Sequence, residues 1–282
     1  MLWGSSFIFF KELSPVFGPL LTSGVRIMFS SIFMFLFFAI TKREMNWRAN
    51  IKVLFVVGIL NSAIPFTLYA YAALYIPSSL SVILNSTSPI FGAMLGVFIL
   101  KEKISLNKYI GLLVGFVGVG IVSSFVFVEP DKLMIFSIIA CLLAAFMYGL
   151  AGVYVKQKGN GLDPYTLTYG SLTFAGISML VLYVVLIPFN IHPEIVSSNI
   201  PFDILLLVLF GILCTSIPYI VYYKLIIEIG PVKALTVTYL MPIFGIVWSL
   251  IYGEEFRITM IIGLLVVLVG IYILSLKKEI KQ

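Results

Sequence analysis

Four prolines interrupt long apolar stretches of this 282-residue chain, each close to amide, hydroxyl or thiol side chains. A proline within a helix has no N–H group for the carbonyl four residues before it, so that carbonyl is left free. Pro89 frees the carbonyl of Asn85 in this way, with Ser86 and Ser88 nearby. Carbonyls, amides and hydroxyls without a neighbouring base bind ligands by hydrogen bonds and supply no activated nucleophile. The pattern therefore predicts a binding site.

The other three breaks lie at Pro65, Pro218 and Pro242, and they free the carbonyls of Asn61, Cys214 and Thr238. A kink that helps helices to pack is the plainer explanation of any one of them. Their paired placement beside polar groups favours a lined cavity at mid-membrane depth, because such groups persist there only against protein, water or ligand.

Aromatic residues gather in the same segments. Tyr and Trp in membrane proteins most often anchor helix ends at the interface, but residues such as Tyr69 and Tyr222 lie too deep for that. Their rings could stack on a planar substrate or hold an ammonium group. We expect the cavity to be lined by Trp3, Asn61, Tyr69, Asn85, Ser88, Tyr148, Thr215, Tyr219, Tyr222, Thr238, Tyr239 and Trp248.

Arg26 is the one charge well inside an apolar run. Two interpretations stay open: it binds substrate, or it reaches a membrane interface or fastens a helix end. The sequence offers no mid-helix Asp or Glu and has its only His in a loop, so no catalytic triad or metal site can be assembled within the membrane. We expect no enzyme activity, no metal and no cofactor.

The composition is that of an integral membrane protein. Hydrophobic residues make up 61% of the chain and charged residues 11%, against roughly one quarter charged in soluble domains. The net charge of +6 comes mainly from short gaps between apolar runs, where it indicates topology. We expect the lipid bilayer as a partner, and no nucleic acid.

Apolar runs of helical length predict an all-α protein with ten transmembrane helices, the first truncated at Met1–Phe10. The others are expected at 16–40, 53–76, 77–100, 109–128, 133–155, 164–187, 204–227, 234–252 and 260–276. Residues 53–100 carry no charge. One helix over this range would be about 72 Å long, so a tight turn at Ile76-Pro77 must divide it.

The second half of the chain repeats the first. GILNSAIPFTLYAY from Gly58 matches GILCTSIPYIVYYK from Gly211, and SPIFG ending at Gly92 matches MPIFG ending at Gly245, both 153 residues apart. The repeat predicts two five-helix units, at 1–128 and 129–282. By internal comparison, roughly a dozen residues of the first helix are absent.

Because five is odd, the second unit should enter the membrane inverted, around a central cavity. Basic residues support this, since they collect in the gaps that inversion places on one side. These residues are Lys42, Arg43, Arg48, Lys52, Lys101, Lys103, Lys108, Lys156, Lys158, Lys277, Lys278 and Lys281. We therefore expect a multi-pass protein of the cytoplasmic membrane with both termini in the cytoplasm.

Several motifs occur together along nearly the whole chain: Leu2-Trp3-Gly4-Ser5-Ser6, Arg26, AALYIP at 72–77, Pro89, Leu100-Lys101-Glu102, Tyr222, Gly230-Pro231, Tyr239-Leu240-Met241-Pro242, Gly253-Glu254-Glu255 and Gly263. In this combination the chain resembles the EamA-type transporters of the drug/metabolite transporter superfamily. The resemblance implies ten helices around a cavity lined mainly by helices 1, 3, 4, 6, 8 and 9. It is weak for substrate, since members carry amino acids, other metabolites or drugs.

The resemblance and the polar, aromatic, carboxylate-free lining together predict an exporter of small metabolites, such as amino acids or related compounds. Rocking of the two repeats about a midplane site would move them. Two alternatives remain: an exporter of lipophilic drugs, or a structural or sensory membrane subunit that transports nothing. A small-molecule substrate is the expected partner. A monomer suffices for this mechanism, and a homo-oligomer stays open.

Overall fold

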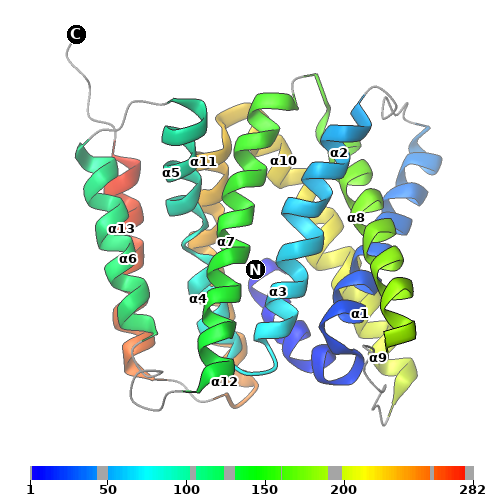
Figure 1. The fold of residues 1–282 in the computed structure, drawn as a ribbon, viewed down its shortest axis with the longest axis horizontal. Coiled ribbons are helices and arrows are strands. Elements are labelled where there is room, and N and C mark those ends of the chain that lie inside the picture. The colour runs from blue at the N-terminus through cyan, green and yellow to red at the C-terminus, as the bar shows by residue number, and fades with distance from the viewer. Residues whose placement is uncertain are drawn as a thin grey trace.

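Long apolar runs fold as helices because a helix satisfies its own backbone hydrogen bonds where water is absent. The computed structural model describes residues 2–42, 50–101, 106–123, 131–159, 161–189, 199–254 and 257–276. All secondary structure within these ranges is helical, and the helices form one bundle (Figure 1). Six helices in this part are long and apolar enough to cross a membrane, and three shorter apolar helices accompany them.

The first helix, α1 (Leu2–Thr41), consists of two arms. Gly18 separates them with φ 74° and ψ 160°, a backbone conformation that glycine adopts most readily. Thr22 Oγ1 donates to the Leu13 carbonyl across the break at 3.1 Å. The sequence predicted an end to the first arm at Phe10, but the helix continues to the residue before Gly18.

The rest of the first half consists of α2 (Ile51–Gly58), the π-helical turn η2 (Ile59–Ala63), α3 (Ile64–Ala72), α4 (Ser78–Asn85), α5 (Ser88–Leu100) and α6 (Leu106–Val122). The segments from α2 to α3 form one continuous helix. The next helix is interrupted between α4 and α5, at Ser86 and Thr87. The turn predicted at Ile76-Pro77 lies between the end of α3 and the start of α4, as expected.

The second half begins with α7 (Lys132–Lys158), α8 (Pro164–Leu186) and the 3₁₀ turn η4 (Ile187–Phe189). It continues with α9 (Ile200–Gly211), the π-helical turn η5 (Ile212–Ser216), α10 (Ile217–Ile229), α11 (Pro231–Leu235), the 3₁₀ turn η6 (Thr236–Leu240), α12 (Met241–Ile251) and α13 (Ile258–Ser275).

Helix irregularities recur at the spacing of the sequence repeat. The π-helical turns η2 and η5 begin 153 residues apart, and so do α3 and α10, which carry Pro65 and Pro218. The helices that carry Pro89 and Pro242, α5 and α12, also begin 153 residues apart. The two halves therefore share their helix breaks as well as their sequence motifs.

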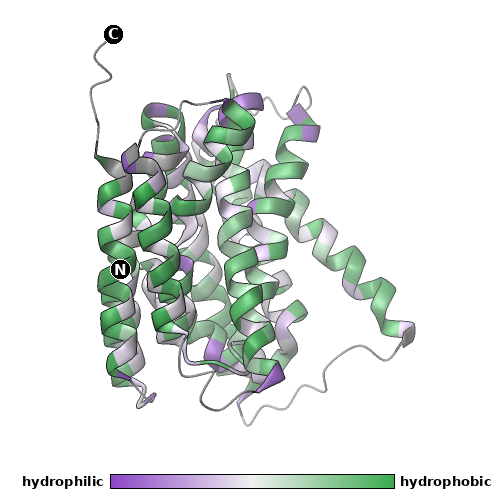
Figure 2. Ribbon diagram, turned by 60° about the vertical axis from the view of Figure 1, so that its left-hand side comes forward, coloured by the Kyte–Doolittle hydropathy of each residue, from purple (hydrophilic) through white to green (hydrophobic). Residues whose placement is uncertain are grey.

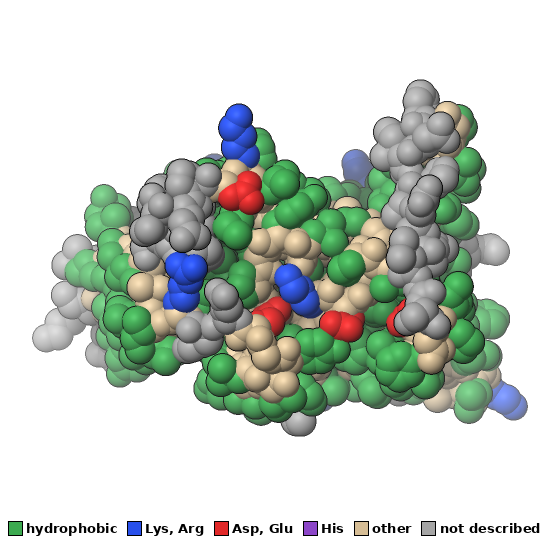
Figure 3. Space-filling view, turned by 90° about the horizontal axis from the view of Figure 1, so that it is seen from below, with side chains coloured by type: hydrophobic (Ala, Val, Ile, Leu, Met, Phe, Trp, Pro, Cys, Tyr) green, Lys and Arg blue, Asp and Glu red, His purple; other side chains and the backbone are tan. Residues whose placement is uncertain are grey.

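The surface of the bundle is apolar along its length. Large side chains such as Phe35, Phe98 and Val117 are more than half exposed, which suits contact with lipid. Figure 2 shows hydrophilic residues gathered at the two ends of the helices. Figure 3, seen from the end where α12 lies, shows Lys, Arg, Asp and Glu side chains on this face, with apolar side chains around them. This distribution is that of a multi-pass membrane protein.

Small residues let α6 and α13 approach backbone to backbone. A Cβ atom added to Gly118 would lie 2.6 Å from the Val267 nitrogen, and one added to Gly270 would lie 2.5 Å from the Gly115 nitrogen. Glycine stripes of this kind are typical of membrane helix pairs. These glycines are packing residues at the far side of the bundle from α9 (Figure 1).

Candidate substrate-binding cavity

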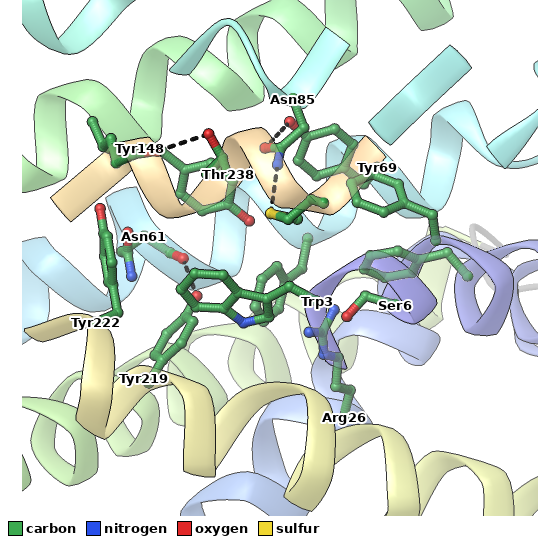
Figure 4. A pocket seen from close by; sticks show the side chains of 15 residues that line it. Trp3, Ser6, Arg26, Asn61, Tyr69, Asn85, Tyr148, Tyr219, Tyr222 and Thr238 are labelled. Carbon is green, nitrogen blue, oxygen red and sulfur yellow. Dashed lines mark hydrogen bonds between the residues drawn. The ribbon is translucent and has the colours of Figure 1, made fainter. Parts of the chain in front are cut away.

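A cavity of about 50 Å³ lies between side chains from both halves of the chain. This volume holds several waters, so a metabolite fits only when the surrounding groups move apart. The lining residues are Trp3, Ser6, Phe7, Phe10, Arg26, Asn61, Phe66, Tyr69, Asn85, Tyr148, Tyr219, Tyr222, Leu235, Thr238 and Met241. They come from α1, η2, α3, α4, α7, α10, α11, η6 and α12, and Figure 4 shows their side chains converging on one space.

Most of the residues expected at the cavity line it: Trp3, Asn61, Tyr69, Asn85, Tyr148, Tyr219, Tyr222 and Thr238, together with Arg26. Ser88, Thr215 and Trp248 do not. Ser88 and Thr215 are fully buried behind the lining, and Trp248 is half-buried on α12. The side chain of Tyr239 lies outside the described part of the structure.

Six lining residues were not predicted: Ser6, Phe7, Phe10, Phe66, Leu235 and Met241. Helical spacing could have found the first three, because positions three, four and seven after Trp3 share its helix face. Phe66 likewise lies three residues before Tyr69 on α3. Leu235 and Met241 carry no polar or aromatic signal that would distinguish them from packing residues.

Each carbonyl freed by a proline accepts a hydrogen bond within the protein. Ser88 Oγ donates to the Asn85 carbonyl at 2.6 Å, and the Tyr219 hydroxyl donates to the Asn61 carbonyl at 2.5 Å. The remaining two partners are Arg26 Nη2, which donates to the Cys214 carbonyl at 3.2 Å, and the Met241 N–H, which donates to the Thr238 carbonyl. The four carbonyls thus hold the cavity wall together, and two of the bonds join the halves.

Arg26 is buried among aromatic rings and does not reach a membrane interface. It is 2% exposed, and Nε donates to Thr215 Oγ1 at 2.7 Å. The guanidinium carbon lies 3.8 Å from the centre of the Phe66 ring and 3.9 Å from that of Phe210. The side chain therefore fastens α1 to the π-helical turn η5 and also lines the cavity.

The Asn85 side chain connects the halves on another wall. Its Oδ1 accepts from the Tyr69 hydroxyl at 2.8 Å, and its Nδ2 lies 3.5 Å from the Met241 sulfur. Both amide atoms are thus engaged by α3 and α12 (Figure 4). This arrangement orients the end of α4 against the second half.

Aromatic rings form the body of the cavity wall. Trp3 meets Tyr222 edge to face with ring centres 5.5 Å apart, and Tyr219 edge to face at 6.2 Å. Tyr69 and Tyr148 stack with centres 6.2 Å apart. Rings in these arrangements attract each other beyond simple burial, and their remaining faces can receive a planar or apolar part of a ligand.

An apolar groove of about 310 Å³ adjoins the cavity. Trp3, Tyr222 and Met241 line both spaces, so these three side chains form the partition between them. The rest of the groove is lined by Leu2 of α1, by Ile217, Pro218, Val221 and Leu225 of α10, and by Val237 and Leu240 of η6.

The fold and the cavity together define the class: a multi-pass α-helical membrane protein with an internal cavity lined by both halves of the chain. The sequence profile of the EamA-like transporter family matches residues 1–124 and 135–276. The chain belongs to this family, which is one of membrane transporters.

Relatives from several organisms align over nearly the whole chain. The uncharacterized transporter YoaV of Bacillus subtilis is 23% identical over 96% of this chain and 92% of its own length. An uncharacterized transporter of Archaeoglobus fulgidus is 23% identical over 98% and 95%. A chloroplastic WAT1-related protein of Arabidopsis thaliana is 24% identical over 97% of this chain and 66% of its own. A crystal structure of 12% identity shares the fold, with a TM-score of 0.67 over 97% of this chain and 92% of that one.

Proposed function

We propose that the protein exports small metabolites, amino acids or related compounds, across the cytoplasmic membrane, and moves them chemically unchanged. The observation that carries this proposal is the cavity, because both halves of the chain contribute polar and aromatic side chains to it. A site of this kind at the boundary between two repeats is the arrangement by which many transporters alternate their access.

The mechanism follows from two inverted five-helix units, 1–128 and 129–282, that rock against each other. The two separate family matches and the helix breaks spaced 153 residues apart support this division. The small cavity volume is that of a state in which the halves have closed on each other. Opening at one end would widen the site toward one side of the membrane, with both termini in the cytoplasm.

Counterflow in proteoliposomes tests the proposal. Purified protein is reconstituted and loaded with each of the twenty L-amino acids, and uptake of the labelled compound is followed. Saturable exchange of at least one supports the function, and its absence for every amino acid and related metabolite overturns the substrate assignment. Metabolite profiling of the medium from cells with and without the gene gives the direction.

Export of lipophilic drugs is the second candidate, since the cavity wall is largely aromatic and apolar. It predicts a resistance phenotype on overexpression, with no accumulation of metabolites in the medium. The two outcomes separate the candidates.

A further inference from the structure

Arg26 carries a positive charge that no carboxylate balances within the described part of the chain. Within the helix that carries Arg26, the acidic residue Glu12 is exposed, and the Arg26 hydrogen bonds go to a hydroxyl and a carbonyl. A buried charge without a counterion is costly in a protein interior and in a membrane. A charged residue inside a membrane segment usually serves the function of the protein.

One edge of the guanidinium is free. Nε and Nη2 donate to Thr215 and Cys214, whereas Nη1 is buried with no hydrogen-bond partner. Phe66 and Phe210 cover the flat faces of the group, so a ligand can only meet it edge on. A planar edge of N–H donors matches the geometry of a carboxylate.

The cavity wall also contains an amide oxygen and a hydroxyl group that have no hydrogen-bond partner. The Asn61 Nδ2 donates to the Tyr223 hydroxyl at 3.0 Å, which leaves Asn61 Oδ1 buried without a partner, and the Tyr222 hydroxyl also has none. Figure 4 shows Asn61 and Tyr222 on one side of the Trp3 ring and Arg26 on the other. A free acceptor oxygen suits an N–H or O–H group of a ligand.

We propose that Arg26 Nη1 binds the carboxylate of the transported molecule, while Asn61 Oδ1 accepts from a hydrogen-bond donor elsewhere on the same molecule. This inference rests on the proposed function and narrows its substrate class to small carboxylates with an apolar or aromatic body and a donor group. It disfavours lipophilic cations, because a ligand of the same sign as Arg26 would leave the buried guanidinium uncompensated.

Matched acids and carboxamides test the carboxylate contact. Counterflow is measured for the twenty L-amino acids and for their carboxamides, in which a neutral amide of nearly the same shape replaces the negatively charged carboxylate. We expect any transported amino acid to move at least about tenfold faster than its carboxamide, since buried polar groups left unpaired discriminate strongly. In Arg26→Gln the acid-to-amide ratio should fall close to one. Equal rates for acid and amide in the wild type, or an unchanged ratio in Arg26→Gln, overturn the proposal.

Two further variants separate binding from folding. Thr215→Val removes a bond to the same guanidinium but keeps the charge, so it should lower the melting temperature and preserve the acid-to-amide ratio. Asn61→Asp adds a carboxylate to the cavity and should lower the ratio even if Arg26→Gln does not fold. A ratio that Asn61→Asp leaves unchanged counts against the site.

A binding readout distinguishes this proposal from transport itself. The melting temperature of the detergent-solubilised protein is measured with each acid and each carboxamide. A shift with acids alone, without flux, would overturn amino-acid transport and support the carboxylate site. A lack of both flux and shift would overturn both.

Discussion

Two neighbouring tyrosines of α10 occupy the same cavity wall with different roles. The Tyr219 hydroxyl donates to the Asn61 carbonyl that Pro65 leaves free, whereas the Tyr222 hydroxyl is buried without a partner. One hydroxyl therefore contributes to the stability of the wall, and the other is available to a ligand.

Replacing each tyrosine with phenylalanine should separate these roles. Tyr219→Phe leaves a buried carbonyl unsatisfied and should lower the free energy of unfolding by about 1 kcal/mol, measured by reversible unfolding in mixed micelles. Tyr222→Phe should leave that free energy unchanged and raise the KM for transport about tenfold if its hydroxyl binds substrate. Equal loss of stability in both variants would contradict the assignment.

At the scale of elements, the loop after α12 is fastened to the start of α4 by one carboxylate. Glu254 accepts from the Ser78 N–H at 2.9 and 3.1 Å, from Ser78 Oγ at 2.7 Å and from Ser249 Oγ at 2.6 Å. A carboxylate is favoured at a helix N-terminus, where N–H groups are free. The position that matches Ser78 in the second half is Pro231, which has no N–H to offer, so this contact has no counterpart there.

Glu254→Gln should weaken the closure of the bundle at this end, because a neutral amide binds the N-terminus of α4 less strongly than a carboxylate. The measurement is the rate at which a water-soluble maleimide labels Ser6→Cys, a cavity residue, in a background carrying Cys141→Ala and Cys214→Ala. We expect faster labelling from the side where Glu254 lies. Glu228→Gln, an exposed partner of Lys224, is the control, and an unchanged rate in Glu254→Gln would refute a closing role.

The glycine contacts between α6 and α13 allow a matched test within one helix. Gly118→Ala would place a methyl group 2.6 Å from the Val267 nitrogen and should destabilise the protein by about 1–3 kcal/mol. Gly120→Ala meets no atom within 4 Å and should stay within a few tenths of a kcal/mol of the wild type. The free energy of unfolding in mixed micelles is compared for the two variants. A similar loss in both would show that α6 and α13 can move apart without destabilising the protein.

The elements differ in how far their sequence predicts them. Helix breaks at Pro65, Pro89, Pro218 and Pro242 are predictable because the missing N–H is a local property. The partners of the freed carbonyls are less so: Tyr219 lies far along the chain from Asn61, and only the packed bundle brings them together. The first arm of α1 was predicted too short, since its charged residues resembled a loop although they extend the helix to Gly18.

The candidate site likewise combines residues that the local sequence predicts with residues that only the packed bundle brings together. Depth and residue type were enough to predict the Trp, Tyr and Asn residues of the lining, but not its phenylalanines or which face of a helix each residue occupies. Trp248 on α12 shows this, since it lies away from the cavity. Arg26 fastens η5 and lines the cavity, and its binding of substrate stays a prediction. The aromatic rings around it come from separate helices, which no local pattern predicts.

At the scale of the whole molecule, the proposed inversion of the halves makes a prediction about topology. Lys42 follows the second arm of α1, and Ser197 lies in the corresponding connection of the second half, after α8. If the halves are inverted, these two positions face opposite sides of the membrane. If they are parallel, the positions face the same side.

Single cysteines at the two positions decide between these arrangements. In a background with Cys141→Ala and Cys214→Ala, a membrane-impermeant maleimide is applied to intact cells and to permeabilised cells. The basic residues near Lys42 favour the cytoplasm, so Lys42→Cys should be labelled only after permeabilisation and Ser197→Cys in intact cells. Gln282→Cys, at the basic tail, should behave like Lys42→Cys. Labelling of Lys42→Cys and Ser197→Cys under the same condition would rule out inversion. It would also rule out a mechanism in which two halves, related by a two-fold axis in the membrane plane, exchange their roles at the two faces of the membrane.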